Sequence, residues 1–153
     1  MAKKIKKTIS TEIPMEQIPI ENDGYHLTIP ARINGKKARL LIDTGASRTV
    51  FDKNRIIPFL KEQEAEFEEN EQLSTAMGTN QLQSQIFILD RLKLGDLKIR
   101  DYPAILLDMV HVNHSYEKLD IQPIDGVLGG DILSRYKAVI YYKTNKLKLY
   151  FKD

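Results

Sequence analysis

Short runs of alternating apolar and polar residues follow one another along the chain, which predicts β-strands rather than helices. Asn34-Gly35 separates two of these runs, and Asn-Gly between alternating apolar residues is a strong signal for a tight hairpin. The second arm of this hairpin leads directly into Asp43. The strand-like runs are Met15 to Glu21, Tyr25 to Ile33, Ala38 to Ile42, Leu92 to Ile99 around a turn at Gly95-Asp96, Tyr102 to Leu107, Ala138 to Tyr142, and Lys146 to Phe151.

Three other segments depart from this simple pattern. Lys53 to Glu71 is highly charged and contains Pro58, so we expect one short helix or a loop there. Gln72 to Asp90 alternates loosely on both sides of a turn at Met77 to Asn80. His111 to Pro123 is polar and irregular, which predicts a mobile surface loop. The pattern as a whole predicts an all-β protein with one or two short helices.

The chain is expected to form one compact soluble domain over residues 13–153. It has 153 residues, of which 42% are hydrophobic, and no apolar run is long enough to cross a bilayer. Residues 1–12 are expected to be a flexible basic tail, with a surface for anionic partners as the alternative. The lysines of this tail are not followed by the apolar stretch of a secretory signal, so we expect a cytoplasmic location by default.

Charge and cysteine content exclude several classes of function. The 23 basic and 21 acidic residues leave a formal charge of +2, which argues against a dedicated nucleic-acid binder and selects no membrane partner. The chain has no cysteine, which excludes disulfides, thiolate zinc sites and cysteine nucleophiles. No cofactor is expected.

The most informative chemistry lies at the end of the hairpin. Asp43 follows the apolar run Leu40 to Ile42, which places a carboxylate at the end of a strand expected to be buried. Burial raises the free energy of ionisation, and Gly45 permits a tight turn that brings backbone N–H groups close to the carboxylate. This context is typical of a poised acid or base.

The segment Ile42 to Ser47 resembles the active-site segment of retropepsin-like aspartic peptidases, especially the short bacterial members. Ile124 to Leu133 resembles their later apolar-apolar-Gly segment, which packs beneath the catalytic loop. The resemblance extends from about Ile18 to Phe151 and implies a closed β-barrel or sandwich. It implies roles for Asp43 as catalytic carboxylate, Thr44, Gly45 and Ala46 in the active-site loop, Ala76, Met77, Gly78 and Thr79 in a substrate-binding flap, Arg48 as a substrate-cleft candidate, and Thr49, Gly126, Gly129 and Asp131 as structural support.

The mechanism that this resemblance implies needs two aspartates, which share one proton and activate a water molecule to hydrolyse a peptide bond. Aspartic proteases are the standard example of such a pair. The chain contains a single Asp-Thr-Gly, so the resemblance implies a homodimer in which Asp43 meets its counterpart. Peptides or proteins are the implied substrates. The interface is expected to include the Thr44 loops and strands from the chain ends, where Leu147, Leu149 and Phe151 would pair with a neighbour and cover an exposed edge.

Several alternatives remain open at this stage. Asp125 or Asp131 is the alternative second carboxylate within one chain. Thr44 either bonds across the dimer axis or is a plain turn residue. Arg48 either favours acidic substrate side chains or is simply exposed. Viral members commonly have an acidic residue at the place of Ser47 and an arginine at the place of Gly130, and this chain lacks both.

Two other functions compete with peptide hydrolysis. The first is a peptide-binding or dimerisation module that keeps the fold and does not cleave. The second is a metal-dependent hydrolase, because His111 and His114 are three residues apart with Asp108 and Glu117 nearby. No third strong ligand is fixed by the spacing, and the segment lacks a convincing helical pattern. We therefore interpret the two histidines as loop residues and expect no metal.

Overall fold

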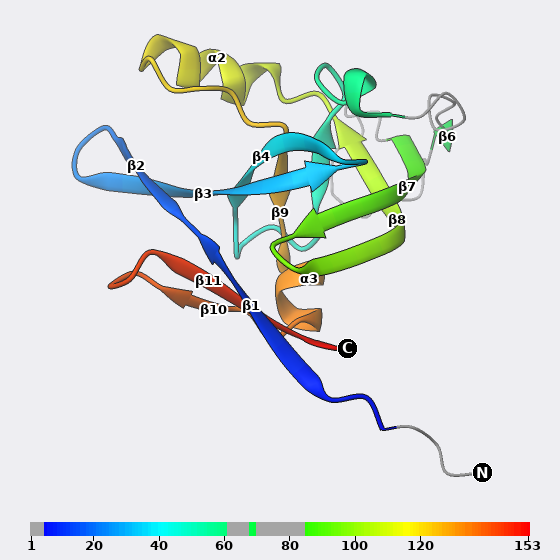
Figure 1. Ribbon diagram of the computed structural model, residues 1–153. Coiled ribbons are helices and arrows are strands. Elements are labelled where there is room, and N and C mark those ends of the chain that lie inside the picture. Colours follow the sequence, from blue (N-terminus) through cyan, green and yellow to red (C-terminus); the bar gives the residue numbers. More distant parts are fainter. Residues whose placement is uncertain (1–4, 61–67, 70–84) are drawn as a thin grey trace.

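The computed structural model describes residues 5–60, 68–69 and 85–153, which form mostly β-structure (Figure 1). The described helices are short, which confirms the predicted all-β class. The strands are β1 (Thr8–Pro14), β2 (Glu16–Ile20), β3 (Gly24–Ile33), β4 (Lys36–Ile42), β5 (Val50–Asp52), β6 (Glu68–Glu69), β7 (Gln85–Leu94), β8 (Leu97–Leu107), β9 (Gly126–Leu128), β10 (Val139–Tyr141) and β11 (Lys146–Lys152). The helices are the 3-10 turn η1 (Ile57–Phe59), α2 (Val110–Lys118) and α3 (Gly130–Arg135).

Most strands belong to one sheet that closes into a barrel. Its order is β2-β3-β4-β9-β5-β8-β7-β6, and a further pairing of β3 with β7 closes the ring β3-β4-β9-β5-β8-β7. The β3–β4 and β7–β8 hairpins lie next to each other in this ring (Figure 1). β9 runs between β4 and β5, parallel to β4 and antiparallel to β5. The central position of β9 brings the later apolar-Gly segment directly beside the strand that ends at Asp43.

The predicted Asn-Gly hairpin is confirmed between β3 and β4. Asn34 and Gly35 have φ values of +50° and +85°, the left-handed conformations that a type I′ turn needs at both central positions. The Asn34 side chain extends the turn to β7, because its Oδ1 accepts a hydrogen bond from the Arg91 N–H at 3.1 Å. Local sequence therefore sets this turn, and contact with a neighbouring strand holds it in place.

The barrel is filled mainly by aliphatic side chains, together with the phenylalanines Phe51 and Phe87. Fully buried members of this core include Ile33, Leu40, Phe51, Leu92 and Leu106. A second, smaller cluster joins the barrel to α2 and consists of Val50, Ile105, Met109, Tyr116, Ile124 and Val127. Burial of these side chains is the main free-energy gain that holds the strands in register. No helix in the described ranges is both long and apolar enough to span a bilayer.

The predicted flexible tail is wrong over residues 8–12, which belong to β1. β1 pairs antiparallel with β11 from Thr8 opposite Lys152 to Pro14 opposite Lys146, within a three-stranded sheet of order β1-β11-β10. The ordered part of the chain therefore begins before residue 13. β11 is the central strand of this sheet, and Leu147 and Leu149 are buried within their own chain. The outer strands of this sheet are β1 and β10, and β10 covers β11 only from Lys146 to Lys148. From Leu149 onward, β11 has no strand partner on that side among the described residues.

The predicted irregular loop over His111 to Pro123 is also wrong, because α2 occupies most of it. The start of α2 is held by the buried carboxylate of Asp52, which accepts hydrogen bonds from Met109 N at 3.2 Å and from Asn113 Nδ2 at 3.0 Å. Further along the helix, the Tyr116 hydroxyl lies 2.6 Å from His26 Nδ1 on β3. Contacts with distant strands thus stabilise a helix that its own sequence encodes weakly.

Candidate active site

Asp43 stands at the start of a tight turn directly after β4. Its N–H donates to the carbonyl of Leu128 on β9 at 3.0 Å, so the turn begins where β4 and β9 separate. Its Oδ1 accepts a hydrogen bond from Gly45 N at 2.9 Å, and its carbonyl accepts one from Ala46 N at 3.2 Å. The Gly45 N–H therefore fixes one oxygen of the carboxylate, which leaves the other oxygen for a second group.

The turn itself is exposed, although the strand behind it is buried. Leu40 and Ile42 are buried, whereas Asp43, Thr44 and Gly45 are exposed in the single chain. The sequence predicted a carboxylate at the end of a buried strand, and the strand agrees with this prediction while the carboxylate itself lies at the surface. A surface carboxylate on this hydrogen-bonded turn is accessible to water, to a substrate or to a second chain.

Gly129 and Gly130 pack closely against the residues that follow the turn. Gly130 N donates to the Ala46 carbonyl at 2.7 Å. A Cβ atom on Gly129 would lie 2.6 Å from the carbonyl carbon and oxygen of Arg48, which is closer than any side chain tolerates. The loop and the start of α3 therefore approach each other at backbone distance, and glycine at position 129 makes this approach possible.

Thr49 and Asp131 connect the loop to α3 through side chains. Asp131 Oδ1 accepts hydrogen bonds from the N–H and the hydroxyl of Thr49, both at 2.8 Å. The Thr49 hydroxyl oxygen in turn accepts a hydrogen bond from Gly129 N at 2.9 Å. Thr49 is fully buried, so these bonds are shielded from water and hold the base of the loop firmly.

The second oxygen of Asp131 is also occupied. It accepts a hydrogen bond from the Tyr102 hydroxyl on β8 and lies 3.7 Å from Arg48 Nε. Burial raises the pKa of Tyr102, and its hydrogen bond to Asp131 raises the pKa further, so the phenol remains a donor well above neutral pH. No pattern in the sequence points to Tyr102, because only the fold brings β8 beside α3.

Gly126 makes a second close approach, at the start of β9. A Cβ atom there would lie 2.6 Å from the Val50 carbonyl oxygen and 3.0 Å from the Phe51 ring. Glycine thus lets β9 fit between its neighbours. Arg48 lies beside the loop and lines a pocket of about 210 Å3 together with Tyr102, Asp131, Arg135 and other residues.

We expect Asp131→Ala to destabilise the protein by about 3 kcal/mol, because it removes the acceptor of three hydrogen bonds, two of them from the buried Thr49. Asp131→Asn should lower the free energy of unfolding by less than about half of that amount, since its amide oxygen can still accept hydrogen bonds from Thr49. Unfolding by urea, followed by circular dichroism, measures both values. If Asp131→Ala unfolded at the same urea concentration as the wild type, the hydrogen bonds of Asp131 to Thr49 and Tyr102 would not contribute to stability.

Asp125 and Asp131, the alternative intrachain partners of Asp43, are both engaged elsewhere. Asp125 accepts hydrogen bonds from Arg55 Nε and from Arg39 N, each at 2.9 Å. Arg39 precedes Asp43 by four residues on an extended strand, which corresponds to about 13 Å. Asp131 accepts hydrogen bonds from Thr49 and Tyr102. Within the described ranges, neither carboxylate is thus available to Asp43.

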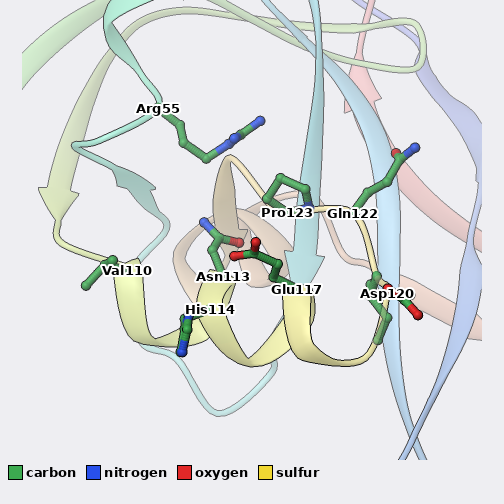
Figure 2. Close-up of a pocket in the computed structure, with 9 residues that line it drawn as sticks. Arg55, Val110, Asn113, His114, Glu117, Asp120, Gln122 and Pro123 are labelled. Carbon is green, nitrogen blue, oxygen red and sulfur yellow. The ribbon is translucent and has the colours of Figure 1, made fainter.

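The flap residues Ala76, Met77, Gly78 and Thr79 lie outside the described residues. The histidines considered as metal ligands lie on α2, and His114 and Glu117 line an open pocket of about 490 Å3 beside Arg55 (Figure 2). Asn113 and Glu117 come to this pocket from α2, whereas Gln122 and Pro123 come from the segment that follows the helix (Figure 2). Among the described residues, no group of three or more His, Asp or Glu side chains is placed to hold a metal ion.

Comparisons with known proteins agree with this geometry. The sequence model of a family described as aspartyl protease matches residues 29–132. A retropepsin-like aspartic protease from Rickettsia conorii has a similar structure, with a TM-score of 0.56, 18% identity and coverage of 99% of this chain and 98% of that chain. The retroviral protease-like domain of Ddi1 from Leishmania major has a TM-score of 0.54, 16% identity and coverage of 81% of this chain and 87% of that chain. A search of curated proteins gave no match.

The family match covers more than half of the chain, from β3 to the start of α3. It includes the Asp-Thr-Gly turn, the β9 strand beside it, and Asp131 with its hydrogen-bond partners Thr49 and Tyr102. The two solved structures independently show the same fold at low sequence identity. The chain therefore belongs to the aspartyl protease family, with the fold of the retropepsin-like aspartic proteases.

Proposed function

We propose that this protein is an aspartic endopeptidase in which a water molecule is activated between the Asp43 carboxylates of two protomers. The observation that carries the proposal is the exposed Asp43 carboxylate on a hydrogen-bonded turn, in a chain of the aspartyl protease family. Asp125 and Asp131 are committed to other partners, so a second Asp43 is the carboxylate that fits. A homodimer follows from this requirement.

The proposed chemistry needs only the two carboxylates and water. Two carboxyl groups in contact cannot both ionise, so one is a carboxylate and the other keeps its proton. The carboxylate takes a proton from the water as the water attacks the peptide carbonyl carbon, and the protonated partner donates its proton to the carbonyl oxygen. The carboxyl group that took the water proton then passes it to the departing amide nitrogen, and the C–N bond breaks. The other carboxylate takes back a proton from a hydroxyl of the diol, which restores the shared proton of the pair. The Gly45 N–H orients Asp43 by holding Oδ1.

Other residues have supporting roles in the proposal. Thr44 is expected to bond across the dimer axis, while Gly129, Thr49 and Asp131 hold the loop in place. Residues 76–79 are proposed as a flap that closes over an extended peptide and excludes water. Arg48 is proposed to lie at the rim of the substrate cleft.

The test is to incubate the purified protein with a diverse peptide library from acidic to neutral pH and to identify products by mass spectrometry. We expect internal cleavage that a transition-state-mimicking inhibitor of aspartic proteases blocks and a metal chelator leaves unchanged. Absence of any cleavage by an intact dimer would favour a peptide-binding or dimerisation module. Cleavage that the chelator abolishes and the inhibitor leaves intact would instead favour metal-dependent hydrolysis near His111 and His114.

A further inference from the structure

Basic side chains form a continuous row across four neighbouring barrel strands. In the strand register, Lys37 on β4 lies opposite Arg32 on β3, Arg32 lies opposite Lys93 on β7, and Lys93 lies opposite Lys98 on β8. A second row begins two residues away, where Arg91 on β7 lies opposite Arg100 on β8. All of these positions are exposed or half-buried and alternate with buried apolar residues, so their side chains share the outer face of the barrel. The basic face consists of Arg32, Lys37, Arg91, Lys93, Lys98 and Arg100.

The basic face brings like charges together on neighbouring strands. Three ion pairs among the described residues involve other arginines, namely Arg39 with Glu16, Arg48 with Asp131, and Arg55 with Asp125. Like charges directly opposite on adjacent strands destabilise a sheet. The formal charge of the whole chain is only +2, so this cluster is a local concentration of positive charge. An anionic partner would relieve the repulsion.

A groove runs along one side of the basic face. A pocket of about 440 Å3 lies between β1 and the barrel, and three cations of the basic face contribute to its wall. The opposite wall comes from β1, with Glu12 as its acidic member and Ile13 and Pro14 as its apolar part. The lining residues are Glu12, Ile13, Pro14, Pro30, Ala31, Arg32, Lys37, Ala38, Lys93 and Gly95. The groove therefore offers apolar contact beside three positive charges.

We propose that the basic face and this groove form a docking surface for acidic segments of polypeptide substrates, away from the catalytic turn. This proposal rests on the proposed peptidase function for the identity of the partner. Polypeptide fits better than nucleic acid, because the groove has apolar walls as well as charge and the whole chain is nearly neutral. Lys37 precedes Asp43 by six residues on extended β4, or about 20 Å. An acidic stretch six or more residues from the cleaved bond is therefore within reach of both sites.

Binding of a fluorescent 12-residue peptide of alternating Glu and Ser tests the proposal directly. The measurement uses fluorescence anisotropy and Asp43→Asn protein, so that turnover plays no part in it. The triple variant Arg32→Glu, Lys37→Glu and Lys93→Glu should raise Kd at least about tenfold, since three attractions become repulsions. Affinity should also fall as salt is added. The matched control changes three exposed lysines elsewhere, Lys53→Glu, Lys118→Glu and Lys143→Glu, and should change Kd less than about twofold.

Three results would overturn the proposal: equal loss of affinity in both triple variants, no binding by the wild type, or tighter binding of a single-stranded oligonucleotide of equal charge. If the variant with Glu at positions 32, 37 and 93 failed to fold, alanine at these three positions should still raise Kd measurably. Cleavage separates this proposal from the proposed function. In the variant with Glu at positions 32, 37 and 93, KM should rise for peptides with a distal acidic stretch, while cleavage of short neutral peptides should be unchanged. An inactive wild type that still binds the acidic peptide at this face would refute the peptidase function alone.

Discussion

Asp43→Asn is expected to lower peptide hydrolysis by at least about 10³-fold while the fold and the dimer remain. The amide has nearly the same size as the carboxylate, and its oxygen can still accept the hydrogen bond from Gly45 N–H. It cannot take a proton from water, so the general base is lost. Turnover of a cleavable library peptide measures the effect, and circular dichroism and sedimentation verify the fold and the assembly.

Asp23→Asn provides a matched control for this variant. Asp23 is exposed in the turn between β2 and β3, so the same chemical change there removes a surface charge far from the catalytic turn in the sequence. Its activity should equal that of the wild type. Activity of Asp43→Asn at the wild-type level, in a preparation free of contaminating protease, would refute the role of Asp43.

Activity per chain is expected to fall when the protein is diluted below the dimer dissociation constant. A site made of two Asp43 side chains exists only in the dimer, and far below Kd the dimer fraction is proportional to concentration. Each tenfold dilution in that range should therefore lower activity per chain about tenfold. Sedimentation over the same concentrations measures the dimer fraction, and concentrating the sample should restore the activity.

The structure suggests where the second chain would bind. The turn at Asp43 is exposed, and β1 and β10 each have one hydrogen-bonded neighbour among the described strands. Open strand edges are natural sites for pairing with another chain. Pairing by strands from the chain ends stays a prediction from the sequence, because β1 covers β11 along its length whereas β10 covers it only from Lys146 to Lys148. The interface is therefore expected to involve the edges of the three-stranded sheet β1-β11-β10 and the Thr44 turns.

The sequence predicts the barrel well where local signals determine it. The Asn34-Gly35 turn, the arms around it and the turn at Gly95 all depend on short-range patterns and positive φ values. Two errors in the predicted secondary structure have nonlocal causes. β1 was missed because Thr11 is a buried polar residue that interrupts the apolar alternation, and its hydroxyl accepts a hydrogen bond from Asp96 N on a distant turn at 3.0 Å. α2 was missed because Asp52, far away in sequence, fixes its start.

The candidate site could be predicted only as far as its motifs extend. Asp43 and the glycine segment of β9 carry sequence signals, and the structure places them side by side. The exposure of Asp43 could not be inferred, because the buried strand ends one residue before it. Tyr102 also could not be found, since its hydrogen bond to Asp131 depends on how β8 packs against α3. The flap prediction at residues 76–79 remains a prediction.

The most direct test of the shared site is to mix wild-type chains with Asp43→Asn chains at a constant total concentration well above Kd. After the subunits have exchanged, only dimers with two native Asp43 side chains should be active, because a mixed dimer lacks one of the two carboxylates. Total activity should then fall as the square of the wild-type fraction. A linear fall with that fraction, in a mixture shown to exchange subunits, would mean that each chain hydrolyses peptides alone and would contradict the shared site.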